Sequence, residues 1–257
     1  MCQYSDVAAE VRERVDGPLL VVTLDDPERL NAYDGATLEA VAAAGGSLGG
    51  DPDLRARGLT GAGQRAVCAG AHIGAVAGGG FDDPPYPDLA ENLAAKPVVA
   101  AIEGLCLGGG MMVACGCDLR VAGRSASFGL PEARWNLPAQ WLGALSRQLL
   151  PAHALELALV ADERLPAPRL YEMGWLTRVC DDGRALDEAI GLASRVSAMA
   201  PRAVRHFKEL VHAGTWGAPE RVLARGMEQS VELMGMADTV EGGRAFAERR
   251  DPVYRDG

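Results

Sequence analysis

The sequence has 257 residues, 48% of them hydrophobic and 5% aromatic, which suffices for one large domain with an aliphatic core. Its formal net charge of −10 argues against nucleic acid or an anionic membrane surface as the main partner. The N-terminus shows no signal-peptide pattern and the longest apolar runs are too short to cross a bilayer, so we expect a cytoplasmic protein.

The first part of the chain predicts strands, helices and loops in alternation. In order, these are a β-hairpin over residues 7–25, a loop over 27–32, a helix over 35–44, strands over 54–60 and 67–73, a loop over 74–87 and a short helix over 88–95. Asp16 and Gly17 are typical of the hairpin turn, and Asp34 is a suitable N-cap for the first helix.

The most informative stretch is residues 96–118. Residues 97–102 form an apolar run of the length expected for a strand that is buried on both faces. Gly108, Gly109 and Gly110 then remove side chains from the turn, which lets the backbone approach a ligand closely. The N–H groups that begin the following helix have no intrahelical acceptor and suit a developing negative charge on oxygen. A tight strand-to-helix turn without chemistry is the alternative.

The remainder of the chain changes from short strands to helices. It predicts strands over residues 119–122 and 127–129, helices over 139–150, 152–161 and 166–173, a strand over 175–179, and helices from residue 184 onward. Asp238 and Glu241 have the spacing of a capping box for the last helix. We expect a boundary near residue 195, and we expect the apolar residues of the final helices to pack on another subunit.

Six cysteines are present, and their spacing does not favour a metal site. None belongs to a C-x-x-C pair, and Cys115 and Cys117 do not have the spacing of a common zinc knuckle. In a reducing compartment we expect buried free thiols and no bound metal.

Two glycine-containing turns predict an oxyanion hole. Residues 68–71 and 107–110 each follow a strand, and each offers one backbone N–H to a common point. Glu132 lies in a third segment and is a candidate for general acid–base chemistry, with a surface carboxylate or a helix cap as the alternative. The glycines do not fit the dinucleotide-binding pattern, and the chain lacks the G-x-S-x-G motif of serine hydrolases.

Taken together, these segments resemble the crotonase family, also called the enoyl-CoA hydratase/isomerase family. The resemblance covers nearly the whole chain and is carried by PERLNA at 27–32, LTGAGQRAVCAGAHI at 59–73, KPVVAAIEGLCLGGG at 96–110, CDLRVAGRSASFGLPEA at 117–133 and FAERR at 246–250. It implies an α/β fold, with a spiral of β-β-α units over residues 1–195 and a C-terminal helical region over 196–257 that forms homotrimers or hexamers. The substrate would be an acyl-CoA, so that coenzyme A is part of the substrate and no separate cofactor is expected.

Carried over position by position, the resemblance assigns three catalytic groups. The backbone N–H groups of Ala71 and Gly109 would bind the thioester oxygen, and Glu132 would transfer the proton. Arg29 would lie near a phosphate of coenzyme A, or else be an ordinary solvated surface residue. The residues that would bind the substrate are Arg29, Leu30, Ala32, Ala69, Met112, Trp135, Leu137 and Gln140.

One departure from the family pattern bears on the reaction. Hydratases of the family carry a glutamate where this chain has Met112, so Glu132 remains as the single acidic group and hydration should be weak. Single-glutamate members shift the double bond of 3-enoyl-CoA to give 2-enoyl-CoA, which makes isomerisation the first expectation. The alternatives are hydration with one glutamate, decarboxylation of a malonyl-type thioester, and a catalytically weak CoA-binding scaffold.

Two further departures concern the shape of the site. His72 replaces the aspartate that is common in the family, and it is either a solvated loop residue or a titrating group at the site mouth. The segment from Trp135 to Trp141 is one residue shorter than the family pattern, which suggests a reshaped acyl pocket for a short, branched or cyclic group.

Overall fold

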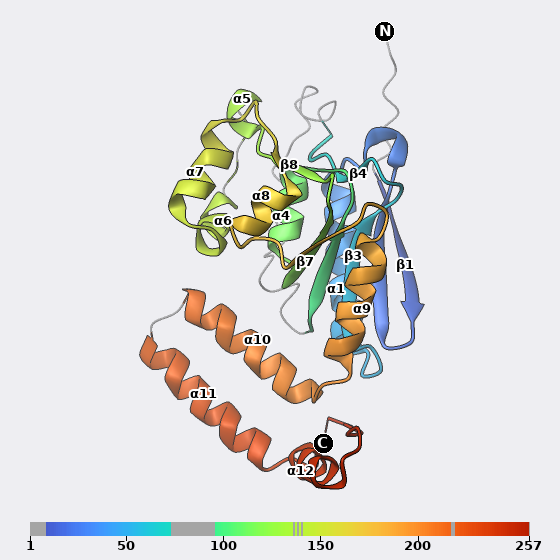
Figure 1. Ribbon diagram of the computed structural model, residues 1–257, viewed down its shortest axis with the longest axis vertical. Coiled ribbons are helices and arrows are strands. Elements are labelled where there is room, and N and C mark those ends of the chain that lie inside the picture. The colour runs from blue at the N-terminus through green and yellow to red at the C-terminus, as the bar shows by residue number, and fades with distance from the viewer. Residues whose placement is uncertain are drawn as a thin grey trace.

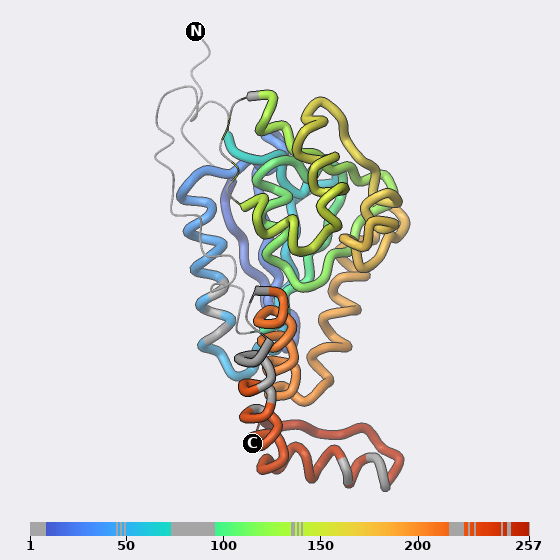
Figure 2. Tube along the Cα trace, turned by 90° about the vertical axis from the view of Figure 1, so that its left-hand side faces the viewer, coloured from blue at the N-terminus to red at the C-terminus, as the bar shows by residue number. Residues whose placement is uncertain are grey.

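The computed structural model describes residues 9–72, 96–135, 137, 139, 141–216 and 219–256. Two β-sheets form its body, helices cover them, and three C-terminal helices extend away from them (Figure 1). The view in Figure 2, turned by 90°, also shows these last helices below the body. In the described part of the chain, no helix has both the length and the hydropathy needed to span a bilayer.

The larger sheet has the strand order β1-β2-β3-β5-β7-β10. Its strands are β1 (Glu10–Asp16), β2 (Leu19–Asp25), β3 (Ala56–Gly61), β5 (Val98–Ile102), β7 (Leu119–Gly123) and β10 (Arg178–Cys180). β1 and β2 form the predicted antiparallel hairpin, with Asp16 opposite Leu19, and the other neighbours run parallel. The hairpin turns at Gly17, whose φ of +56° is easily adopted by glycine.

The smaller sheet consists of β4 (Ala66–Cys68), β6 (Leu105–Leu107), β8 (Ser127–Gly129) and β9 (Leu165–Pro166). β4, β6 and β8 are parallel neighbours, and each follows one strand of the larger sheet, namely β3, β5 and β7. The chain therefore alternates between the two sheets as it advances, which confirms the predicted spiral. Because the strands are parallel, the ends of three successive turns of the spiral lie side by side.

The helices are α1 (Gly35–Gly50), α4 (Gly109–Cys115), α5 (Glu132–Trp135), α6 (Leu142–Gln148), α7 (Pro151–Leu159), α8 (Ala167–Glu172), α9 (Ala185–Ser197), α10 (Pro201–Trp216), α11 (Pro219–Met234) and α12 (Ala237–Glu248). Alternate residues of β5 enter two separate clusters, so that Ala100 packs with α1 and α4 while Val99 and Ala101 pack with α9. This confirms that β5 is buried on both faces.

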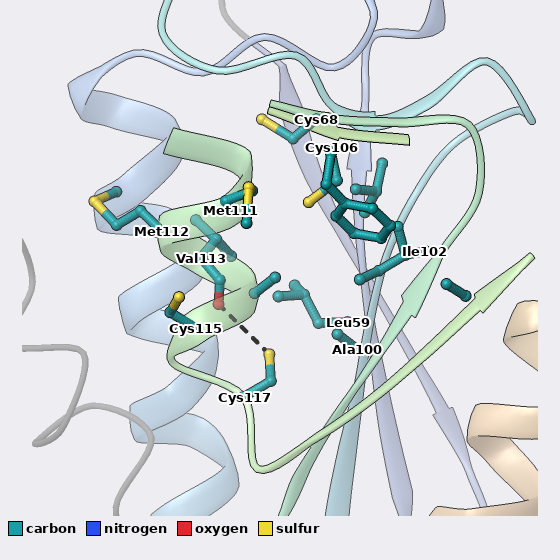
Figure 3. Close-up of a cluster of buried hydrophobic side chains, with 14 of the residues drawn as sticks. Leu59, Cys68, Ala100, Ile102, Cys106, Met111, Met112, Val113, Cys115 and Cys117 are labelled. Carbon is teal, nitrogen blue, oxygen red and sulfur yellow. Dashed lines mark hydrogen bonds between the residues drawn. The ribbon is translucent and has the colours of Figure 1, made fainter. Parts of the chain in front are cut away.

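A cluster of sulfur-containing side chains surrounds α4 (Figure 3). The thiols of Cys68, Cys106, Cys115 and Cys117 are free and buried, as the sequence predicts. Burial raises the pKa of Cys68 and of Cys115 to about 12 and that of Cys117 to about 11, so these thiols stay protonated at neutral pH.

Two predicted boundaries are wrong. The first helix does not end at Ala44 but continues to Gly50, because Leu48 lies in the next turn and is buried in the core. Trp175 does not begin a strand, and β10 starts three residues later at Arg178. The Trp175 ring is buried against Phe128 in an edge-to-face contact, with ring centroids 5.6 Å apart.

The predicted capping box at the start of the last helix is also wrong. α12 begins at Ala237, so Asp238 lies inside the helix. Its carboxylate accepts hydrogen bonds of 2.8 Å from the backbone N–H groups of Arg255 and Asp256, and it thereby holds the C-terminal segment. The predicted loop over residues 74–87, the helix over 88–95, and the ends of the hairpin and strand at residues 7–8 and 73 lie outside the described residues.

A buried ion pair connects α10 to the larger sheet. The Lys208 ammonium donates to Asp118 Oδ2 at 2.8 Å and to the Lys96 carbonyl at 2.9 Å. His212 Nε2 lies 3.1 Å from Asp118 Oδ1, and the Val98 N–H also donates to Asp118. Burial of Asp118 opposes its ionisation, but the hydrogen bonds from His212 and Lys208 hold its pKa below its ordinary value.

We predict that Lys208→Met destabilises the protein by about 3 kcal/mol, because it leaves the buried Asp118 carboxylate without its cation. The matched variant His212→Gln should cost less than about 1 kcal/mol, since the imidazole is half-exposed. Urea unfolding followed by tryptophan fluorescence measures both. Equal losses in the two variants would show that the buried pair is not what holds α10.

Candidate active site

The two glycine-containing turns meet where β4 and β6 end. A Cβ placed on Gly70 would lie 3.6 Å from the backbone nitrogen of Gly109, and one placed on Gly110 would collide with the carbonyl oxygen of Cys68. Gly70 has a φ of +101°, in the region that favours glycine. Residues 68–71 and 107–110, which are separate in sequence, therefore form one continuous backbone surface.

The segment that carries Glu132 lies next to the second glycine turn, residues 107–110. The Gly108 N–H donates to the Gly129 carbonyl at 2.9 Å, at the end of β8. Two residues later the chain reaches Pro131, and Glu132 begins α5. A Cβ placed on Gly108 would lie 2.8 Å from Glu132 Oε1, so the carboxylate lies directly against the backbone of the glycine turn.

The two predicted oxyanion donors carry free N–H groups. Within the described residues, neither the Ala71 N–H nor the Gly109 N–H donates a hydrogen bond. Gly109 is the first residue of α4, so its N–H has no intrahelical acceptor. Unpaired N–H groups are uncommon in protein interiors, and two of them side by side would suit an oxygen that carries negative charge.

Glu132 is held in a poorly solvated position. Its side chain is largely shielded from solvent, and its Oε2 atom is buried without a hydrogen-bond partner in the described part of the chain. Burial raises the pKa of Glu132 above its ordinary value, because the ionised form loses contact with water. The carboxylate therefore lies at the glycine turn and is only partly exposed.

Met112 lies one turn along α4 from the glycines. Its N–H donates to the Gly108 carbonyl at 3.2 Å, and its side chain is fully buried. In the view of Figure 3 it projects on the side of α4 opposite the sheet residues Leu59 and Ala100. A thioether accepts hydrogen bonds only weakly, so this buried position is apolar.

Residues 27–32, predicted as a loop, begin with a 3-10 helix over Pro27–Arg29, and they lie alongside the first glycine turn. The Ala69 N–H donates to the Leu30 carbonyl at 3.0 Å, which brings together two of the predicted substrate-binding residues. Asn31 is fully buried between them, and its amide nitrogen donates to the Ala66 carbonyl at 2.8 Å. Leu30 and Asn31 both have positive φ angles, and the buried amide bonds hold this tight turn.

The structure describes the other predicted binding residues to different extents. The Arg29 guanidinium donates to Asp26 at 3.1 Å and is partly exposed, while Ala32 follows in the same loop. Leu137 is attached to Glu132 through a hydrogen bond from its N–H to the Glu132 carbonyl at 3.0 Å. The side chain of Trp135 and the whole of Gln140 lie outside what the structure describes.

Sequence reasoning missed two residues that shape the site, Asn31 and Tyr33. The signal for Asn31 was its place in a turn, because asparagine tolerates left-handed backbone and bonds to nearby carbonyls. Tyr33 gave no sequence signal, since its partners are distant in the chain. The Tyr33 carbonyl accepts a bond of 2.9 Å from the His72 N–H, and its ring lies against Gly109.

The described residues thus assemble two unpaired N–H groups and one carboxylate of raised pKa around a single glycine turn. This arrangement suits proton transfer next to a carbonyl, because the N–H groups stabilise the enolate oxygen while the carboxylate moves the proton. Among the same residues, no three His, Cys, Asp or Glu side chains are arranged to hold a metal ion.

Comparisons with known proteins identify the family and the fold. The family model described as enoyl-CoA hydratase/isomerase matches residues 14–257. Enoyl-CoA hydratase EchA19 of Mycobacterium tuberculosis is 33% identical over 252 residues, which are 93% of this chain and 94% of that protein. Carnitinyl-CoA dehydratase of Salmonella paratyphi B is 32% identical over 251 residues, with 93% and 96% covered.

Solved structures show the same similarity. The crystal structure of an enoyl-CoA hydratase from Mycobacterium tuberculosis superimposes with a TM-score of 0.90 at 34% identity, covering 97% of this chain and 100% of that one. A probable enoyl-CoA hydratase/isomerase from Mycobacterium abscessus gives 0.84 at 35% identity, with 98% and 100% covered.

We predict that Glu132→Gln stabilises the folded protein at neutral pH. Folding raises the pKa of Glu132, so the protonated side chain stabilises the folded protein at low pH. This stabilisation is lost as the pH rises through the pKa that Glu132 has in the folded protein. The variant should gain about 1 kcal/mol at pH 7.5, since it removes the charge of a poorly solvated carboxylate whose Oε2 atom has no hydrogen-bond partner among the described residues.

Urea unfolding at several pH values measures this gain, which should vanish below about pH 4, where the wild-type side chain is protonated. Glu39→Gln, at an exposed position of α1, is the control and should show no comparable gain. A variant that is less stable than wild type at pH 7.5 would contradict the assigned environment of Glu132.

Proposed function

This chain belongs to the enoyl-CoA hydratase/isomerase family, and we propose that it converts a 3-enoyl-CoA to the 2-enoyl-CoA. The observation that carries the proposal is the environment of Glu132, whose carboxylate of raised pKa lies against Gly108. The next residue, Gly109, has an N–H that donates to no acceptor in the described part of the chain. An isomerase needs one group that serves as base and then as acid, and Glu132 is suited to both.

In the proposed reaction, Glu132 removes a proton from C2 of the bound 3-enoyl thioester. The electron pair moves into a dienolate whose negative charge lies largely on the thioester oxygen, where the N–H groups of Ala71 and Gly109 donate to it. The protonated Glu132 then returns the proton to C4, which leaves the double bond between C2 and C3. No proton is gained or lost overall, and each N–H donor is worth about 3 kcal/mol of transition-state stabilisation.

The side chains around Glu132 support a proton shift over the addition of water. A carboxylate whose pKa is raised by burial releases and accepts protons more evenly near neutral pH than a solvated one. Met112 is fully buried at the position where family hydratases carry their second glutamate. Its thioether orients an attacking water far less well than a carboxylate does.

Hydration with a single glutamate is the second candidate. It is favoured by the names of similar proteins, which include an enoyl-CoA hydratase and a carnitinyl-CoA dehydratase. Both reactions share the enolate and both use Glu132, so the geometry of the N–H groups does not separate them.

The deciding experiment offers the purified protein three substrates: 3-hexenoyl-CoA, crotonyl-CoA and methylmalonyl-CoA. We expect isomerisation of 3-hexenoyl-CoA at least tenfold faster than hydration of crotonyl-CoA, and a loss of about 1,000-fold in kcat for isomerisation in Glu132→Gln. Glu39→Gln should retain wild-type rates. Turnover of crotonyl-CoA alone would refute the isomerase proposal and favour hydration. Decarboxylation of methylmalonyl-CoA that persists in Glu132→Gln would refute it and favour a decarboxylase.

We also propose that the protein assembles as a homotrimer, or as a hexamer of two trimers. Large apolar side chains recur at helical spacing on the exposed faces of α10 and α11, and these are Phe207, Val211, Met227, Val231 and Met234, each 61–75% exposed. An apolar stripe of this kind is a common mark of a surface that a partner covers.

The oligomer is tested with the double variant Met227→Glu/Val231→Glu, which places two charges on the exposed face of α11. Light scattering after size exclusion should give a trimer or hexamer for wild type and a shift to the monomer mass for the variant. Val15→Glu, on an equally exposed valine of β1, is the matched control and should leave the mass unchanged. A monomeric wild type would refute the assembly.

A further inference from the structure

We infer that Tyr33 is a positioning residue that holds the two amide-bearing turns of the site in one fixed arrangement. The inference rests on the proposed oxyanion role of Ala71 and Gly109. Tyr33 contacts both turns, one through its backbone and the other through its ring. It is 5% exposed, so both contacts lie inside the fold.

The backbone of Tyr33 sets the orientation of the Ala71 N–H. Its N–H donates to the Gly70 carbonyl at 3.0 Å, and its carbonyl accepts from the His72 N–H at 2.9 Å, which makes an isolated parallel bridge at Ala71. The Gly70 carbonyl and the Ala71 N–H belong to the same planar trans peptide and point in opposite directions. Because Tyr33 holds that carbonyl, it also directs the Ala71 N–H away from residue 33.

The ring of Tyr33 supports the second turn. A Cβ placed on Gly109 would collide with the phenol oxygen and would lie 2.5 Å from Cζ of the ring, so the hydroxyl end of the ring lies against the Gly109 backbone. Gly109 carries the second N–H of the proposed oxyanion hole, which donates to no acceptor among the residues that the structure describes. Replacing the Tyr33 ring should therefore shift the Gly109 N–H relative to the Ala71 N–H.

Residues on both sides of Tyr33 hold it in place. Asn31, two residues earlier, is tied to the Ala66 and Ala62 carbonyls by bonds of 2.8 and 3.0 Å. Asp34, the next residue, caps α1 by accepting from the Thr37 N–H at 2.9 Å. Tyr33 is thus a rigid support, and a displacement of about 1 Å in such a site can cost about 100-fold in rate.

The test compares Tyr33→Phe with Tyr33→Leu in the full-length protein. Phe keeps the ring on Gly109, so kcat should stay within about threefold of wild type. Leu removes the aromatic support, so kcat for isomerisation should fall by about 30-fold while KM changes by less than about threefold. Tyr171→Leu, at a half-exposed tyrosine of α8, is the matched control and should behave as wild type.

A binding measurement separates positioning from a general structural effect. Acetoacetyl-CoA can lose the proton between its two carbonyl groups and present an enolate with charge on oxygen, whereas butyryl-CoA presents a neutral thioester of similar size. We expect Tyr33→Leu to weaken acetoacetyl-CoA binding by about tenfold or more and to leave butyryl-CoA binding nearly unchanged, with Tyr33→Phe restoring the wild-type ratio. Equal loss of both ligands in Tyr33→Leu, or no loss in either, would overturn the inference.

The ratio of acetoacetyl-CoA affinity to butyryl-CoA affinity also separates the isomerase proposal from the inference about Tyr33. If the wild type binds acetoacetyl-CoA as an enolate but does not isomerise 3-hexenoyl-CoA, the isomerase proposal fails and the ratio still decides the role of Tyr33. If the wild type binds neither ligand, the oxyanion site itself is refuted and the inference about Tyr33 falls with it.

Discussion

The site depends on three consecutive residues without side chains, at positions 108–110. Each of them makes room for a different neighbour: the first for the Glu132 carboxylate, the second for the Tyr33 ring and the third for the Cys68 carbonyl. A methyl group at any of the three would push one of these neighbours away. The glycines thus do more than permit a tight turn, because they allow three separate turns of the spiral to touch at one point.

Three polar groups that have no hydrogen-bond partner among the described residues lie at that point, while others belong to Arg57 and His206 elsewhere in the fold. In the described residues, the Ala71 and Gly109 N–H groups and one oxygen of Glu132 make no hydrogen bond, although most of the surrounding fold is closely packed and bonded. Each such group costs stability in the absence of a ligand. Their clustering is typical of a site where the structure gives up stability for reactivity.

Much of this architecture was predictable, because it rests on local patterns. Alternation of apolar residues in β1 and β2, and the loss of side chains at the glycine turn, act over a few residues only. The full length of α1 was not predictable, since its glycine-rich end is kept helical by the burial of Leu48. Nor was the contact of Tyr33 with Gly109, because it joins two segments that meet only after the spiral has formed.

The short helix α5 lies outside both sheets, in the connection from β8 to α6 (Figure 1). Residues can be added to or removed from this connection without shifting the register of any strand pair. The reason is that β8 pairs with β6, which precedes the connection in the chain, and with β9, which follows it. Surface connections of this kind tolerate changes in length at small cost. The chain after α5 can therefore vary in length while Glu132, the first residue of α5, keeps its place beside Gly108.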